Sequence, residues 1–149
     1  MRYLSLTATE DIWEAIRALR VRGAPAIGVA AAFGAYLAAY YAPDAELEGR
    51  FLAACDYLAT SRPTAVNLFW ALDRMRAAYG RIKALPPADI RAALRAEAQA
   101  VMDEDIEISL SLIHIFRLSA FVTTCRVPLP EAVPELRVSL SVPAEAGAV

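Results

Sequence analysis

The chain has 149 residues, of which 58% are hydrophobic and 21% are charged, enough for one modest globular core. Fifteen basic residues against seventeen acidic ones give a formal charge of -2, which excludes the broad positive field that attracts nucleic acid. Any anion that this chain binds must therefore be recognised locally.

Two helices are predicted first along the chain. Thr7 and Glu10 have the spacing of a capping box, and apolar residues then recur on one helical face as far as Leu19. This helix is predicted to end at Gly23. A second helix is predicted from Pro25 to about 41, because proline is well tolerated in the first turn of a helix.

The second predicted helix is also long and apolar enough to raise a membrane alternative. No charged residue occurs between Arg22 and Asp44, roughly the length that a membrane-spanning helix needs. The stretch is rich in alanine and glycine, however, and its tendency to insert is therefore weak. Small residues such as Gly28 and Ala32 instead let neighbouring helices approach closely, which predicts a helix buried in the middle of a bundle, with no membrane contact.

Three further helices are predicted. One follows Asp44 and places Cys55 on its apolar face, where we expect a buried structural thiol rather than a nucleophile. The next begins after Arg62-Pro63, and the last runs from about Asp89 to the acidic Asp103-Glu104-Asp105. Residues two apart on a helix point to different faces, so this acidic cluster is predicted to be solvated surface and not a metal site.

The five predicted helices form a mainly α bundle over residues 1–108, after which the pattern changes. Residues 109–149 lose the helical period and contain four prolines, so we expect a separate tail, either disordered or an artefactual, out-of-frame sequence. Within it, Leu110–Ile115 resembles the translation of a transposase-end sequence used to prepare sequencing libraries. The tail holds His114 and Cys125, and neither has an evident catalytic partner. Both cysteines are expected to be reduced, as in a cytosolic protein.

Two arginines stand just before prolines that are predicted to open helices, in Arg22–Pro25 and in Arg62-Pro63. A helix start exposes unpaired N–H groups and the positive end of the helix dipole, and an adjacent guanidinium adds donors suited to phosphate or carboxylate. Thr64 and Asn67 could add neutral hydrogen bonds. The two helix starts could therefore bind one anion, although solvated arginines in ordinary loops explain the same pattern.

Two stretches carry a family resemblance: Arg22–Gly34 (RGAPAIGVAAAFG) and Leu58–Leu68 (LATSRPTAVNL). The order of these two motifs, the distance between them and their amino-acid sequences resemble those of the S-methyl-5-thioribose-1-phosphate isomerase family, within the initiation factor 2B-like superfamily. The likeness extends from about Arg2 to about Ile108. It implies an aldose–ketose isomerase of methionine salvage that converts 5-methylthioribose 1-phosphate into 5-methylthioribulose 1-phosphate without a metal or organic cofactor.

The resemblance also implies a helical N-terminal domain, a Rossmann-like C-terminal domain with the substrate bound between the two, and a cytoplasmic homodimer. Carried over residue by residue, it assigns substrate contacts to four positions: Arg22, Gly23, Ala24 and Arg62. Pro25 and Asn67 are expected to shape this site.

The catalytic cysteine and aspartate of that family have no counterpart in this sequence. Cys125 stands in a different local sequence, Thr123–Arg126, and no aspartate follows Asp105. We therefore expect an N-terminal fragment, truncated at its start and lacking the Rossmann-like domain, that binds substrate without turnover. Two alternatives stay open: a related ribose 1,5-bisphosphate isomerase, and an initiation factor 2B-like regulatory or scaffold protein.

Overall fold

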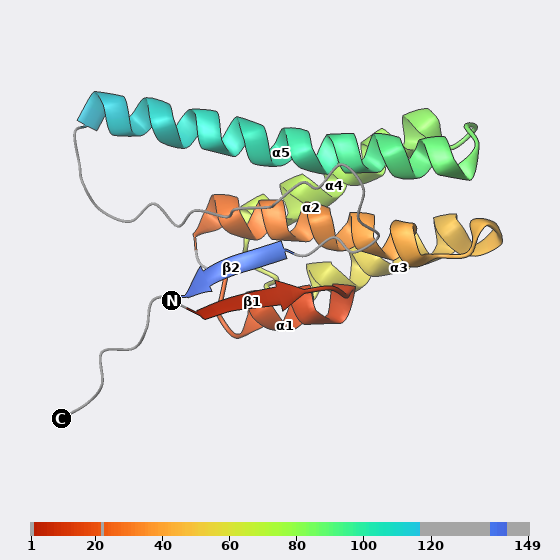
Figure 1. Cartoon of the computed structure of the whole chain (residues 1–149), viewed down its shortest axis with the longest axis horizontal. Coiled ribbons are helices and arrows are strands. Elements are labelled where there is room, and N and C mark those ends of the chain that lie inside the picture. Colours follow the sequence, from red (N-terminus) through yellow and green to blue (C-terminus); the bar gives the residue numbers. More distant parts are fainter. Residues whose placement is uncertain (1, 22, 117–137, 143–149) are drawn as a thin grey trace.

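The computed structural model describes residues 2–21, 23–116 and 138–142. Within them a helical bundle carries a small two-stranded sheet on one side (Figure 1). The elements in chain order are β1 (Arg2–Leu6), α1 (Thr9–Arg17), α2 (Ala24–Tyr41), the 3-10 turn η1 (Asp44–Glu46), α3 (Leu47–Ala59), α4 (Val66–Ile82), α5 (Pro87–Phe116) and β2 (Val138–Val142). The predicted mainly α bundle is confirmed, with the sheet as an addition.

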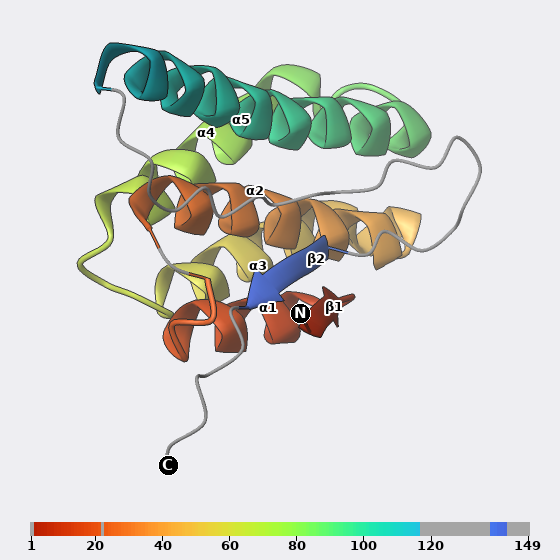
Figure 2. The ribbon, with the colours of Figure 1, turned by 60° about the vertical axis from the view of Figure 1, so that its left-hand side comes forward.

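Helix α2 is the central element of the bundle. It packs against α1, α3, α4 and α5, and Figures 1 and 2 show it enclosed between α5 on one side and α1 and α3 on the other. By length and composition α2 could cross a membrane, but 67% of its residues are buried inside the bundle. A core helix passes the same test, and the predicted burial of this helix is confirmed.

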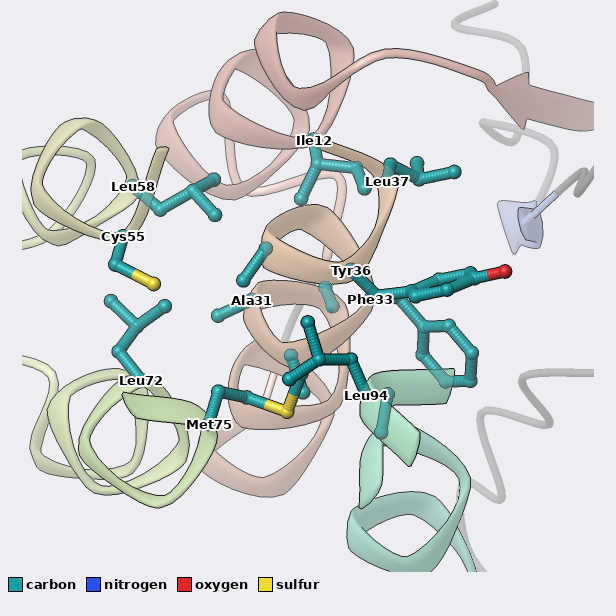
Figure 3. Packing of buried hydrophobic residues seen from close by; sticks show 14 of the residues in the cluster. Ile12, Ala31, Phe33, Tyr36, Leu37, Cys55, Leu58, Leu72, Met75 and Leu94 are labelled. Carbon is teal, nitrogen blue, oxygen red and sulfur yellow. The ribbon is translucent and has the colours of Figure 1, made fainter. Parts of the chain in front are cut away.

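The core fills the space between α2 and its neighbours with large apolar side chains that come from every helix (Figure 3). Phe33 and Leu37 of α2 are 1% exposed, and Cys55 of α3 is fully buried, as predicted. Burying a side chain of this size stabilises the fold by about 2 kcal/mol. The largest members of the cluster with almost no exposure are Ile12, Ile16, Ile27, Phe33, Leu37, Phe51, Leu58, Leu68, Leu72, Met75 and Leu94.

The start of α1 differs from the prediction by two residues. The helix begins at Thr9, and the Asp11 carboxylate accepts hydrogen bonds from the backbone N–H groups of Thr7 (3.2 Å) and Ala8 (3.1 Å). The predicted capping box of Thr7 and Glu10 is therefore wrong in register. Asp11 reaches back to the two N–H groups ahead of the helix, and it also places a negative charge at the positive end of the helix dipole.

Helix α5 extends beyond the end that the sequence pattern predicted. It continues to Phe116, and β2 pairs antiparallel with β1, with Leu6 opposite Val138 and Arg2 opposite Val142. The prediction of a break after 108 is thus wrong for the backbone of 109–116. This stretch contains neither glycine nor proline, so nothing in it ends a helix. Of the rest of the predicted tail, residues 138–142 form β2, whereas 117–137, including Cys125, and 143–149 lie outside the described residues.

Candidate functional site

The loop between α1 and α2 is fixed by backbone hydrogen bonds on one side of the site. After α1 the chain reverses through Leu19 (φ 59°), and the N–H groups of Arg20 (2.9 Å) and Val21 (3.1 Å) both donate to the carbonyl of Ala15. Val21 is 2% exposed and anchors the loop in the core. The chain therefore enters the start of α2 from a fixed position.

Gly23 is the N-cap residue of α2, with φ 93° and ψ 138°. This conformation is strained for residues other than glycine, although an added Cβ would meet no atom within 4 Å. The glycine is therefore required by its backbone angles and not by crowding. With Gly23 and Ala24 both exposed, the first turn of α2 is open to a ligand.

The backbone N–H groups in the first turn of α2 have no polar side chain of that turn as an acceptor. No side chain among the described residues caps it, it contains no acidic residue, and Pro25 removes one of the N–H groups. Helix geometry leaves the N–H groups of Gly23, Ala24 and Ala26 without an acceptor inside the helix. This helix start can therefore donate to an anion.

The loop that carries Arg62 is fixed by a side chain of α1 and by backbone carbonyls of α3. Thr60 accepts a hydrogen bond from Trp13 Nε1 (2.9 Å) and donates to the carbonyl of Tyr57 (2.7 Å). The buried Ser61 hydroxyl donates to the carbonyl of Leu58 (2.6 Å). Arg62 follows this anchored turn, is half-buried, and makes no ion pair with any described residue.

Helix α4 begins later than the sequence predicted. Pro63 does not open the helix; the N–H of Ala65 donates to the carbonyl of Arg62 (3.0 Å), and proline occupies the second position of this turn, where its fixed φ fits. Ala65 is the N-cap of α4, again without a side-chain cap or an acidic residue in the first turn. Both helix starts keep bare N–H groups, but at α4 these are only those of Val66 and Asn67, because the N–H of Leu68 donates to the carbonyl of Ala65 (3.0 Å). Of the two helices, only α2 has a proline within its first turn.

The starts of α2 and α4 meet because Gly28 has no side chain. A Cβ there would lie 3.0 Å from the carbonyl oxygen of Asn67 and 3.5 Å from Cβ of Ala71. Figures 1 and 2 show the starts of α2 and α4 at the same end of the bundle as the C-terminal half of α5. A cleft of about 400 Å³ opens there, lined by Pro25, Gly28, Val29, Val66, Asn67, Trp70, Val101, Glu104, Asp105 and Ile108.

The walls of this cleft are largely apolar, and several are open to solvent. Val66 is 78% exposed, Trp70 49% and Ile108 62%. Arg74 lies over the Trp70 ring at 5.4 Å and binds Glu104 through two hydrogen bonds of 2.6 and 2.8 Å. These bonds hold the pKa of the Glu104 carboxyl below its usual value, so Glu104 stays ionised and serves to join α4 to α5.

The structure bears on the predicted site residues to different degrees. Gly23 and Ala24 lie at the start of α2 next to the cleft-lining Pro25, and Asn67 lines the cleft itself. Arg62 lies in the adjoining loop and not in the cleft lining. Arg22 falls outside the described residues, so its contact with substrate remains a prediction.

The predictions about other reactive groups can be compared in the same way. Burial raises the pKa of the Cys55 thiol to about 12, which fits a structural residue that stays protonated at neutral pH. Among the described residues no cluster of three metal-ligating side chains occurs. Sequence reasoning missed Asp105, which lines the cleft although it was predicted to be plain surface. A signal was present, because Val101, Asp105 and Ile108 share one helical face.

Comparisons with known proteins bear on the same region. Residues 20–117 match the model of the initiation factor 2 subunit family. The methylthioribose-1-phosphate isomerase of Symbiobacterium thermophilum is 56% identical over 107 residues, which are 70% of this chain and 30% of that protein. The 5-deoxyribose 1-phosphate isomerase of Petrotoga mobilis is 47% identical over 114 residues, 74% of this chain and 33% of that protein.

A solved structure gives the same picture. The crystal structure of 5-methylthioribose 1-phosphate isomerase from Pyrococcus horikoshii superposes with a TM-score of 0.69 at 40% identity. The superposition covers 72% of this chain and 31% of that chain. The chain thus spans about a third of the length of the relatives it matches, and the helical bundle is the part that they share.

Proposed function

The chain belongs to the initiation factor 2 subunit family, and on that premise we propose that it is the substrate-binding part of a sugar-phosphate isomerase. The reaction is the conversion of 5-methylthioribose 1-phosphate into 5-methylthioribulose 1-phosphate, an aldose–ketose isomerisation in methionine salvage. The names of the relatives support an isomerase, and two named substrates share a pentose 1-phosphate. The bundle would bind this shared part.

The observation that carries the proposal is the pair of bare helix starts beside one cleft. Helices α1, α3 and α5 each have an acidic residue in the first turn, whereas α2 and α4 have none. An acidic residue there would satisfy the positive end of the helix dipole and repel an anion. Its absence at both starts leaves for a phosphate those N–H groups that have no acceptor, which at α4 are the groups of Val66 and Asn67.

Arg62 is the cation that we assign to the same phosphate. The residue is half-buried on an anchored loop and has no ion-pair partner among the described residues. A planar guanidinium binds two phosphate oxygens at once, which fixes orientation as well as charge. Because the chain carries a net charge of -2, this local arrangement is what would attract the anion.

We assign no catalytic residue to this chain. The expected behaviour is binding without turnover, in which the bundle orients the phosphorylated sugar for proton transfer by groups elsewhere. A regulatory or scaffold function is the second candidate, and the family description itself favours it, since it is that of an initiation factor. A related ribose 1,5-bisphosphate isomerase is the third.

Calorimetric titration of the purified chain separates these candidates. We expect 5-methylthioribose 1-phosphate to bind more tightly than inorganic phosphate, and Arg62→Ala to weaken its binding by about 10- to 100-fold, the effect of a lost charged hydrogen bond. Arg50→Ala is the matched control, because Arg50 already pairs with Glu46 (2.8 Å) on an exposed surface. Tighter binding of ribose 1,5-bisphosphate would favour the bisphosphate isomerase, and no binding of any sugar phosphate would favour a scaffold.

A further inference from the structure

The three consecutive acidic residues of α5, Asp103, Glu104 and Asp105, have different partners. Asp103 accepts a hydrogen bond from Nε2 of Gln99 (2.8 Å), on its own helix. Glu104 is held by Arg74 of α4. Asp105 has neither a hydrogen bond nor an ion pair with any described residue. Asp105 is thus the only one of the three without a partner within the described part of the chain.

Asp105 also lines the cleft, where its carboxylate has no partner among the described residues. It is half-buried there, on the same helical face as Val101 and Ile108, and the same cleft is lined by Val29 of α2 and Trp70 of α4. Burial raises the pKa of its carboxyl. A polar group among apolar walls is costly unless something bonds to it, and such groups in clefts commonly orient a ligand.

We infer that Asp105 accepts hydrogen bonds from hydroxyl groups of the pentose, and so makes the cleft selective for a sugar phosphate over phosphate alone. The inference rests on the proposed function. A carboxylate repels phosphate, so within the cleft it must face the neutral part of the ligand. An ionised carboxylate accepts hydrogen bonds only, and a sugar ring presents several hydroxyl donors. In this arrangement the N–H groups of the bare helix starts bind the phosphate, and the Asp105 carboxylate binds the hydroxyl groups of the sugar ring.

The test compares Asp105→Asn with Asp103→Asn in the full 149-residue chain. Asp103 is the matched control, because it lies two residues away and is not among the residues that line the cleft. Calorimetric titration uses 5-methylthioribose 1-phosphate and inorganic phosphate as the two probes. We expect Asp105→Asn to lower affinity for the sugar phosphate about tenfold and to leave or raise affinity for inorganic phosphate, while Asp103→Asn changes neither.

The free energy of unfolding without ligand is a second measurement. It should fall in Asp105→Asn if Asp105 has a structural role, and it should not fall if Asp105 serves to bind a ligand. Because the folded-state pKa of Asp105 is raised, its contribution to stability is fully present below the unfolded pKa and is lost as pH rises through the folded pKa. At neutral pH the neutral asparagine should therefore leave the free energy of unfolding unchanged or slightly higher. A marked loss of stability in Asp105→Asn would show a structural role and overturn the inference.

The outcomes also separate this inference from the proposed function. If the unaltered chain binds the sugar phosphate and Asp105→Asn binds it equally well, the inference fails and the proposed function stands. If the unaltered chain binds neither probe, both fail. A variant that loses the sugar phosphate and inorganic phosphate to the same extent also overturns the inference, because it places Asp105 at the phosphate.

Discussion

The two ends of α2 are built in opposite ways. At its C-terminal end, the Arg91 guanidinium of α5 donates to the carbonyls of Ala39 (3.1 Å) and Ala42 (2.7 Å), and also pairs with Asp44 (2.7 Å). At its N-terminal end no described side chain caps the helix, and Gly23 contributes none. An arginine of the protein thus meets two carbonyls at one end of α2, whereas no described side chain meets the N–H groups at the other end.

This difference separates an end of α2 that another helix stabilises from the end at which we propose that a ligand binds. Unpaired carbonyls at the C-terminal end would lower the stability of the fold. A partly buried arginine from another helix donates hydrogen bonds to two of them. The N-terminal end lies next to a second bare helix start and beside a cleft. Polar groups left open at one end of a central core helix are most simply explained by a partner that binds there.

The largest expected effect comes from pushing the two bare helix starts apart. Gly28→Val should lower the free energy of unfolding by about 3 kcal/mol, because its Cβ would meet the backbone oxygen of Asn67 at 3.0 Å and a backbone cannot rotate away. Urea unfolding followed by circular dichroism measures the change. Gly49→Val is the control, since a Cβ at Gly49 of α3 meets nothing within 4 Å. Equal effects of the two substitutions would show that α2 and α4 do not approach closely at Gly28.

The second largest effect is expected from removing Arg91, the cation at the C-terminal end of α2. Arg91→Ala should cost about 2 kcal/mol of folding free energy, because it leaves the partly buried carbonyls of Ala39 and Ala42 without a charged donor. Sugar-phosphate binding at the far end should be unaffected. The control Arg50→Ala removes an exposed pair with Glu46 and should cost less than about 0.5 kcal/mol. A similar small loss for Arg91→Ala would contradict the contrast between the two ends.

The sequence predicted the helices more reliably than their starts. Apolar periodicity depends on many residues, so one error does not displace a whole helix, and α2 was predicted to within one residue at its start. A helix start depends on a single hydrogen bond. Pro63 could equally open a helix or sit in a turn, and only the bond from Ala65 to the carbonyl of Arg62 decides between them. Glu10 and Asp11 were likewise interchangeable as the capping residue of α1.

The candidate site was predictable in part for a related reason. Gly23, Ala24 and Asn67 belong to continuous motifs that can be recognised in sequence, and the structure places them at or beside the cleft. Asp105 lines the cleft because of how α2, α4 and α5 pack. The sequence separates it from Asp103 only by the helical face that it shares with Val101 and Ile108. Contacts between segments far apart in sequence are therefore the part that needed the structure.

The smallest expected effect on stability also gives the sharpest comparison, because it turns a bare helix start into a capped one. Ala65 has the extended backbone (φ -84°, ψ 98°) that an N-cap residue adopts. Ala65→Asp and Ala65→Asn should each stabilise α4 by about 1 kcal/mol, since either side chain can accept a hydrogen bond from the first turn.

The two variants should differ in binding, because only aspartate brings a negative charge. We expect Ala65→Asp to weaken binding of 5-methylthioribose 1-phosphate about tenfold through repulsion of the phosphate, and Ala65→Asn to weaken it less. Thermal unfolding and calorimetric titration measure the two quantities on the same samples. If Ala65→Asp is more stable and binds the sugar phosphate as tightly as the unaltered chain does, the phosphate does not lie at the start of α4. The anion would then belong to the start of α2 alone.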